Sequence, residues 1–264
     1  MWMDVVDLRD FYDGSLGQVS RRLLQRRLRA IWPDTRGMRV LGVGFATPFL
    51  GPFLDGSERV LAAMPGAQGV MRWPADGANR VMLADEAELP LPDRSIDRLV
   101  IAHGLEHTEH MRAMMRECWR VLTDGGRMII VAPNRRGIWA RMERTPFGTG
   151  RPYSESQITR LLRDTMFTPL EVGAALYMPP VRWRVALAWA RPLEDLLGRW
   201  RWPDAFAGVL VVEAAKQIYA APTHKLAERR RAYAVVPNPF RNGHRGGARP
   251  AGVRRDRMPN DEEV

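Results

Sequence analysis

The chain has 264 residues, 45% of them hydrophobic, which is enough to bury the core of one domain. Its single cysteine excludes an internal disulfide and a cysteine-rich zinc site. No apolar run approaches the roughly 18 residues that span a bilayer, and the charged N-terminal residues do not resemble a secretory signal. We therefore expect a cytoplasmic protein without a transmembrane segment.

Half of the formal net charge of +10 lies near the C-terminus, where residues 224–264 hold ten Lys or Arg against five Asp or Glu. Such a segment attracts polyanions in a salt-dependent way without choosing a target, so we favour a solvated surface over a nucleic-acid partner. Residues 223–264 also lack apolar periodicity. They are predicted to form a basic, disordered tail.

The expected elements alternate between helices and strands, as in an α/β protein. Residues 4–31 carry an apolar stripe at helical spacing, interrupted near Gly14 and Gly17, and residues 1–35 are predicted to form an N-terminal helical cap. An α/β domain is expected over residues 36–222. Its strands are expected at residues 39–43, 59–64, 80–83, 97–102, 127–132, 169–178 and 207–219, with a helix starting near Ser154.

An insertion rich in Trp and Arg separates the last two expected strands, over residues 181–203. It is predicted to be helical and to break at Pro192. Three roles remain open for it, namely a lid over a substrate site at the edge of the sheet, ordinary packing on the sheet, and peripheral membrane contact.

Two of the expected strands flank a helix and form a βαβ crossover, the unit of a parallel sheet. Residues 97–102 are a short apolar run, typical of a strand that is buried on both faces. Apolar residues then recur at helical spacing between Met111 and Leu122. Gly125 and Gly126 are predicted to end this helix, because glycine adopts the left-handed C-cap conformation without steric cost.

The same stretch resembles the class I S-adenosylmethionine (SAM)-dependent methyltransferases, in particular their type 11 branch. The resemblance rests on four signatures in order: an acid ahead of Leu-Pro (85–90), an Asp-led strand (97–102), Leu-Glu-His (105–107) and E-x-x-R-V-L-x-x-G-G (117–126). It implies a three-layer, doubly wound, Rossmann-like fold with a seven-stranded, mostly parallel sheet whose last strand is antiparallel. The function that it implies is methyl transfer from SAM.

The resemblance also implies a SAM site at the carboxyl ends of the strands. The expected SAM-binding residues are Gly42, Gly44, Ala46, Met64, Asp85, Glu86, Ala87 and His103. Gly44 provides a tight turn, and the resemblance assigns Asp85 to the adenine amino group. Thr47 and Pro48 are predicted as the N-cap and first residue of a helix whose positive end favours the methionine carboxylate.

The first signature of the family, an acid followed by Gly-x-Gly-x-Gly, is altered over residues 42–48. Gly42 stands in place of the acid that helps to hold the methionine amino group. Met64 stands near the place of the acid that grips the ribose hydroxyls. Each such charge-assisted hydrogen bond contributes about 1.5–3 kcal/mol. A non-catalytic, methyltransferase-like binding protein that has lost its SAM anchors is therefore the alternative to an enzyme.

Methyl transfer needs few catalytic side chains, because a sulfonium methyl is already electrophilic. A general base is required only if the acceptor is protonated at neutral pH, and the candidates are Tyr12, His103, Glu106 and His107. The alternative is packing at the surface for Tyr12 and local hydrogen bonds at a helix start for the other three. The acceptor is not identified, and a small molecule is favoured.

Residues 103–107 also match the H-x-x-E-H pattern of a class of zinc peptidases. That chemistry requires both histidines on one helix face. Because His103 directly follows an expected strand, we expect it in the turn before the helix and expect no metal site.

Overall fold

The computed structural model describes residues 3–180 and 207–218. The predictions for the insertion at 181–203 and for the tail at 223–264 lie outside the described residues. No described helix combines the length and the hydropathy that are required to cross a bilayer.

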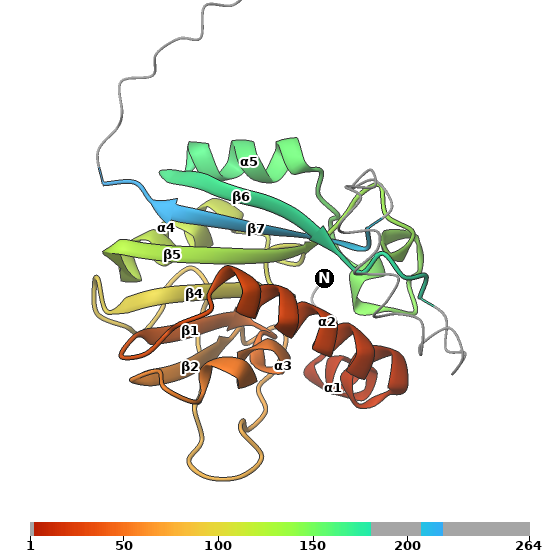
Figure 1. The fold of residues 1–264 in the computed structure, drawn as a ribbon, viewed down its shortest axis with the longest axis horizontal. Helices are drawn as coiled ribbons and strands as arrows, with labels where there is room; N and C mark the ends of the chain where they lie inside the picture. Colours follow the sequence, from red (N-terminus) through yellow and green to blue (C-terminus); the bar gives the residue numbers. More distant parts are fainter. Residues whose placement is uncertain (1–2, 181–206, 219–264) are drawn as a thin grey trace, which may run out of the picture. The chain divides into compact units, whose positions relative to one another are not determined.

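A seven-stranded sheet forms the centre, in the order β3-β2-β1-β4-β5-β7-β6 (Figure 1). β1 pairs in parallel with both β2 and β4, whereas β7 runs antiparallel to both β5 and β6. The strands are β1 (Arg39–Gly44), β2 (Arg59–Met64), β3 (Val81–Leu83), β4 (Ile96–Ala102), β5 (Leu122–Pro133), β6 (Phe167–Ala175) and β7 (Val209–Lys216). The predicted fold, including its antiparallel last strand, is confirmed.

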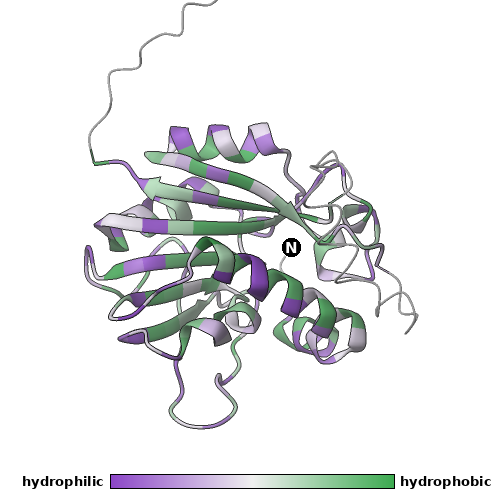
Figure 2. Ribbon diagram, in the orientation of Figure 1, coloured by the Kyte–Doolittle hydropathy of each residue, from purple (hydrophilic) through white to green (hydrophobic). Residues whose placement is uncertain are grey.

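Helices cover both faces of the sheet and complete three layers. The helices are α1 (Val5–Asp13), α2 (Ser15–Ile31), α3 (Thr47–Leu50), α4 (Met111–Val121) and α5 (Glu155–Asp164). α1, α2 and α3 pack on one face, against Val40 and Val100, whereas α4 and α5 pack on the other, against Leu41 and Leu99. Successive residues of one strand thus face the cores on opposite sides of the sheet, as the pleat requires. Figure 2 shows the strands as the most hydrophobic part of the ribbon.

The N-terminal helical segment breaks where its first glycine predicted a break. α1 ends at Asp13, Gly14 adopts an extended conformation, and α2 starts at Ser15. Gly17 lies inside α2, where an added Cβ would collide with the backbone of Phe11. This glycine therefore permits α1 to pack closely on the start of α2.

The predicted C-cap of α4 is wrong. α4 ends at Val121, and Leu122 is already extended, with φ −71° and ψ 139°. Leu122 is fully buried, so the chain passes directly from the helix into β5 to keep this side chain in the core. Gly125 and Gly126 lie within β5, where an added Cβ on Gly126 would stand 2.8 Å from the Thr123 carbonyl oxygen. The second glycine is therefore needed for close backbone approach and not for a helix cap.

Candidate functional site

The strand order reverses between β1 and β4, and the ends of these two strands form the floor of the candidate site. Gly44 ends β1 with φ +79°, and an added Cβ would lie 2.5 Å from the Ala102 carbonyl oxygen at the end of β4. A side chain at this position is excluded by both conformation and space. The tight turn that the sequence predicted at Gly44 is present.

The chain after Gly44 differs from the prediction in one respect. Thr47 is the first residue of α3 and not its N-cap, the cap position belongs to Ala46, and no side chain caps the helix. α3 has only four residues, so its end offers little dipole to an anion. An added Cβ on Gly42 would lie 2.8 Å from both Ala46 Cβ and Leu50 Cδ1. α3 therefore fills the space that an acidic side chain at position 42 would need.

The loop after β2 brings an amide group to the end of β4. Met64, which ends β2, is fully buried. Four residues later, Gln68 is 1% exposed, and its Nε2 donates to the His103 carbonyl oxygen at 2.9 Å. Among the described residues, its Oε1 has no hydrogen-bond partner. Gln68 was not predicted, because a lone glutamine in a loop carries no sequence signal.

His103 lies directly after β4, as the sequence predicted, and joins two other candidates in a buried triad. The Tyr12 hydroxyl lies 2.6 Å from His103 Nε2, and His103 Nδ1 lies 3.3 Å from Glu106 Oε1. The three residues are 4%, 1% and 2% exposed. His103 has φ +49°, a conformation that is uncommon for a residue with a side chain and is typical of functional sites. We refer to these residues as the Tyr12–His103–Glu106 triad.

Electrostatics fix the protonation of the Tyr12 hydroxyl. Burial, together with the nearby Glu106 carboxylate, raises the pKa of Tyr12 well above its ordinary value, so its hydroxyl stays protonated beside His103 Nε2. The alternative of a surface-packed Tyr12 is wrong, because its ring is buried.

Aromatic rings enclose the triad. The ring of Tyr12 stacks on Phe45 with centroids 6.0 Å apart and meets Phe49 edge-on at 5.6 Å. The Phe147 ring lies 5.0 Å from His103. These rings, which are themselves buried, exclude water from the end of β4.

His103 and His107 do not form the pair of metal ligands that the zinc-peptidase pattern requires. Both His103 and His107 occupy the turns between β4 and α4, so they do not share a helix face as the zinc-peptidase pattern requires. His107 is 3% exposed and packs against Gly150, where an added Cβ would lie 3.0 Å from its Nδ1. In the described part of the chain, no group of three or more His, Cys, Asp or Glu is arranged to hold a metal ion.

A cavity of about 600 Å³ opens at the carboxyl ends of β2 and β3, next to the triad segment; we call it the Asp85 cavity. It is lined by Gly66, Ala67, Leu83, Ala84, Asp85, Glu86, Glu109 and His110. Asp85 Oδ1 accepts from the Ala87 backbone N–H at 2.8 Å, and Glu86 Oε1 accepts from the Thr108 hydroxyl at 3.0 Å. The structure thus places Asp85, Glu86 and Ala87 in one turn beside a cavity.

The E-x-x-R signature holds the segment that follows this turn. Glu117 Oε2 accepts from the Leu89 N–H at 2.9 Å, while Arg120 donates to the carbonyl oxygens of Leu89 and Leu91 at 2.9 and 2.8 Å. Arg120 also pairs with Glu117 at 2.7 Å and with Asp93 at 2.6 Å. A fork-shaped guanidinium suits such a clamp, because it donates in several fixed directions. These two signature residues therefore fix the segment of residues 89–93 that follows the Asp85 turn.

A second cavity, of about 220 Å³, lies on the other side of the triad between α1, α2 and α3; we call it the Tyr12 cavity. It is lined by Arg9, Tyr12, Asp13, Arg21, Gln25, Phe45, Thr47, Pro48, Gly51, Met71, Arg72 and Trp73. Arg21 Nε is buried there without a hydrogen-bond partner among the described residues. A cation at this position could receive an anionic group beside Thr47.

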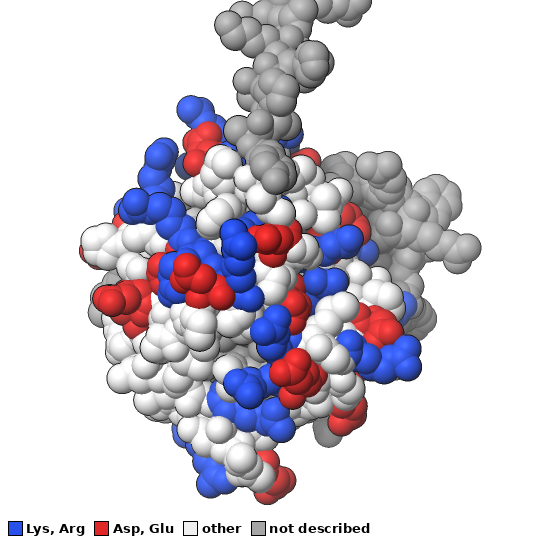
Figure 3. All heavy atoms as spheres, turned by 90° about the vertical axis from the view of Figure 1, so that its left-hand side faces the viewer, with Lys and Arg blue, Asp and Glu red and all other residues white. Residues whose placement is uncertain are grey.

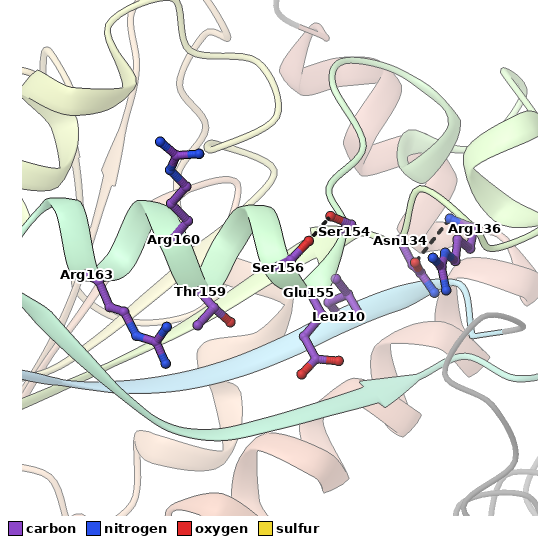
Figure 4. A pocket seen from close by; sticks show the side chains of 9 residues that line it. All are labelled: Asn134, Arg136, Ser154, Glu155, Ser156, Thr159, Arg160, Arg163 and Leu210. Carbon is purple, nitrogen blue, oxygen red and sulfur yellow. Dashed lines mark hydrogen bonds between the residues drawn. The ribbon is translucent and has the colours of Figure 1, made fainter. Parts of the chain in front are cut away.

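A third cavity, of about 450 Å³, lies where β5 ends and α5 begins (Figure 4). Its lining includes Asn134, Arg136, Ser154 and five polar or charged residues of α5, and Ser154 caps α5 in a capping box with Gln157. In Figure 4, Arg163 and Arg160 point to different sides of α5, and Arg160 also pairs with Asp164 at 3.8 Å. Since these arginines do not converge, this cavity has no formed anion site.

Comparison with known proteins gives a family and relatives. Residues 42–130 match a family described as a methyltransferase domain. A relative in Mycobacterium tuberculosis, named as a probable SAM-dependent methyltransferase, is 35% identical over 104 residues, which cover 39% of this chain and 38% of the relative. The demethylmenaquinone methyltransferase of Corynebacterium efficiens is 30% identical over 133 residues, covering 49% of this chain and 56% of the relative. The matched part of the chain thus spans between about two fifths and just over half of the length of these relatives.

Solved structures share the fold. A SAM-dependent methyltransferase of Thermotoga maritima has a TM-score of 0.56 at 15% identity, covering 81% of this chain and 96% of that one. Another, from Archaeoglobus fulgidus, has a TM-score of 0.51 at 18% identity, covering 74% and 94%. The solved structures thus show the same fold, and residues 42–130 are similar to a methyltransferase domain.

Proposed function

We propose that this protein transfers a methyl group from SAM to a small-molecule acceptor. The observation that carries the proposal is the position of the Asp85 cavity beside the buried Tyr12–His103–Glu106 triad, both at the carboxyl edge of the sheet. About 600 Å³ falls within the usual range of roughly 300–1,000 Å³ for small-molecule sites. The N-terminal helices of residues 1–35 act as the cap of the domain that spans 36–222.

The residues of the cavity fit the adenosine end of SAM. The Asp85 carboxylate accepts from the adenine amino group, and the backbone at Glu86 and Ala87 contacts the ring. Met64 ends β2 in the core, and the loop that follows it, with Gly66 and Ala67, faces the ribose. The unpartnered Oε1 of Gln68 provides a buried acceptor in place of the missing acid.

The methionine end extends over Gly44 toward the Tyr12 cavity. Gly42 and Ala46, which flank the Gly44 turn, have small side chains or none. Thr47 lines the Tyr12 cavity. Arg21 attracts the methionine carboxylate of SAM, because α3 is too short to provide a strong helix dipole. The methyl group is thereby directed to the end of β4, next to His103.

When bound, SAM supplies an electrophilic methyl group on a sulfonium. The chain has to align the acceptor with that group and exclude water, which the aromatic rings around the triad accomplish. His103 and Tyr12 are the candidates to contact the acceptor. His107 supports the turn that holds Glu106.

Calorimetric titration with S-adenosylhomocysteine (SAH), the demethylated product, tests the proposal. Asp85→Ala should weaken SAH binding by about 10- to 100-fold, the effect of losing one charge-assisted hydrogen bond. Asp55→Ala, an exposed aspartate in the loop before β2, is the matched control and should bind SAH unchanged. Absence of binding to the wild-type protein at millimolar SAH would favour a non-catalytic relative, and equal affinity of both variants would refute the placement of adenine.

A second ligand separates the two ends of the cofactor. 5′-Methylthioadenosine keeps the adenosine of SAH and lacks the amino acid. Arg21→Ala should weaken SAH binding about 10-fold and leave binding of 5′-methylthioadenosine unchanged, because Arg21 contacts the carboxylate alone. Arg22→Ala, on the exposed side of the same helix, is the control. Equal losses for both ligands would show that Arg21 supports the fold of the site.

A further inference from the structure

We propose that the loop after β5 docks the protein on a bilayer that carries anionic lipid headgroups. This loop spans residues 134–151 at the carboxyl edge of the sheet, and we call it the basic loop (Figure 1). Docking of this kind goes beyond methyl transfer and does not depend on it, so it is measured without SAM or an acceptor.

The positive charge of the basic loop is concentrated and is not neutralised by described acids. The loop holds five arginines against one acid, Glu143, and all five are exposed. The five are Arg135, Arg136, Arg141, Arg144 and Arg151. None of them forms an ion pair with a described residue, whereas the exposed Arg36 and Arg94 pair with Asp34 and Asp124. Unpaired cations gathered on one loop attract an anionic surface.

An exposed aliphatic side chain lies among these arginines. Ile138 is 47% exposed and stands between Arg136 and Arg141 in the sequence. The next residue, Trp139, is fully buried, donates from Nε1 to the Met178 carbonyl oxygen at 2.8 Å and meets the Phe147 ring edge-on at 5.6 Å. The anchored Trp139 therefore fixes the backbone with Ile138 outside the core. An aliphatic group flanked by cations suits the boundary between headgroups and acyl chains.

The basic loop is held at both ends by backbone hydrogen bonds. The Arg135 N–H donates to the Tyr153 carbonyl oxygen at 2.8 Å, and the Arg151 N–H donates to the Glu106 carbonyl oxygen at 2.8 Å. Because the ends are fixed, the loop loses little conformational freedom when it binds a surface. The bond to Glu106 joins the loop to the triad, so docking turns the carboxyl edge of the sheet toward the bilayer.

Lipid fits the basic loop better than nucleic acid does. Surfaces that bind single-stranded nucleic acid combine cations with exposed aromatic rings that stack on the bases. The aromatic residues of this fully described loop are Trp139 and Phe147, which are 0% and 2% exposed. The loop therefore presents an aliphatic group, and no aromatic ring, between its arginines.

Flotation of the full chain with vesicles tests the docking. The protein should bind vesicles of phosphatidylglycerol and phosphatidylcholine and should not bind phosphatidylcholine alone. The double variant Arg136→Gln, Arg141→Gln should bind about 25-fold more weakly, since one arginine near an anionic surface contributes about fivefold. Arg112→Gln, Arg116→Gln removes the same charge from exposed positions of α4 and is the matched control, which should bind as the wild type does.

Two outcomes of the flotation would overturn the proposal. The first is failure of the wild type to bind the anionic vesicles. The second is an equal loss in the two double variants at unchanged melting temperatures, because binding would then follow net charge alone, including that of the C-terminal residues.

A fluorescent label follows the exposed aliphatic position itself. Cys118 is the single cysteine and is buried, and burial raises the pKa of its thiol to about 12, so a cysteine introduced at an exposed position is labelled selectively. Ile138→Cys carrying a nitrobenzoxadiazole dye should shift its emission to the blue on the anionic vesicles. The control is the same label at Leu170→Cys, a 48% exposed position of β6, which should not shift. A label at position 138 that stays in water on bound protein would overturn the insertion of this loop.

Competition separates lipid from nucleic acid. Single-stranded RNA of mixed sequence, at a phosphate concentration equal to that of the anionic lipid, should leave the protein on the vesicles. Ile138→Ser, which keeps the charge, should weaken vesicle binding about tenfold and leave RNA binding unchanged. Displacement of the wild type by RNA, with RNA binding that depends on Arg136 and Arg141, would show that the basic loop is a nucleic-acid surface and not a lipid surface.

Discussion

The two edges of the sheet differ in how a buried carboxylate is paired. Toward the amino ends of the parallel strands, Glu213 accepts from Trp32 Nε1 at 2.9 Å and pairs with Arg127 at 3.2 Å. Lys216, which is 6% exposed, donates to the Leu122 carbonyl oxygen at 2.7 Å and lies 4.0 Å above the Trp119 ring. Figure 3 shows basic and acidic side chains interspersed on the face of the molecule at this edge.

At the carboxyl edge, the Glu106 carboxylate and several neighbouring polar atoms lack hydrogen-bond partners among the described residues. Among the described residues, Gln68 Oε1, His103 Nδ1 and both Glu106 oxygens have no hydrogen-bond partner. A polar group that is buried without a partner lowers stability, so it persists only where another requirement outweighs that cost. The contrast teaches that the paired carboxylate of Glu213 stabilises the fold, whereas the carboxyl edge keeps buried polar groups that are available to a ligand.

The largest effect on stability is expected at the paired edge. Glu213→Ala leaves the Trp32 N–H and the Arg127 charge without their partner, so the free energy of unfolding should fall by about 3 kcal/mol. Urea denaturation measures it. The control is Glu171→Ala, whose half-exposed pair with Arg27 should be worth under about 1 kcal/mol. Equal losses for both variants would remove the distinction between a buried and an exposed carboxylate at this edge.

A smaller loss is expected when the family's acid is restored at the first turn. Gly42→Asp forces a side chain against Ala46 and Leu50, which should cost about 2 kcal/mol and should not tighten SAH binding. Gly125→Asp is the control, because an added Cβ at that glycine meets nothing within 4 Å. Tighter SAH binding by Gly42→Asp would mean that α3 moves aside at little cost and that the absence of the acid weakens SAH binding in the wild type.

The Glu117–Arg120 clamp predicts a pH dependence of smaller size. Hydrogen bonds from Arg120 lower the pKa of Glu117 below its ordinary value of 4.5, despite partial burial. A lowered pKa in the folded state means that the stabilisation is complete above pH 4.5 and is lost as the pH falls through the lowered value. The free energy of unfolding should therefore decline less steeply below pH 4.5 in Glu117→Gln than in the wild type. If the free energies of unfolding of the wild type and of Glu117→Gln fall in parallel with pH, the pKa of Glu117 is the same in the folded and unfolded states.

The smallest effect on stability is expected at the unpaired edge. Glu106→Gln removes a buried charge that has no hydrogen bond, so stability should change by less than about 1 kcal/mol or should increase. A loss of about 3 kcal/mol, as at Glu213, would show that the two edges do not differ in the way proposed.

Much of the fold follows from local patterns in the sequence. The strands Arg39–Gly44 and Arg59–Met64 were predicted to within a residue, because short apolar runs bounded by turn residues specify buried strands. The break in the N-terminal helical segment was predicted as well, because the apolar stripe at helical spacing is interrupted near Gly14. The end of α4 was misjudged, because burial of Leu122 outweighed the preference of two glycines for a helix cap.

The site was only partly predictable. Asp85 and His103 could be named, since a family signature and the end of a strand mark their positions. The bond between Tyr12 and His103 joins residues 91 positions apart, and no local pattern encodes it. Gln68 and Arg21 became visible only through their burial and their unpartnered atoms, which are properties of tertiary packing. Residues that act through distant contacts are therefore beyond what periodicity and spacing predict.

A crystal structure of the protein with SAH tests the central claim most directly. We predict adenine in the Asp85 cavity beside Asp85, the thioether sulfur over Gly44 next to His103, and the methionine carboxylate beside Arg21. SAH in the cavity at the start of α5, or adenine without contact to Asp85, would contradict the proposed arrangement of the carboxyl edge.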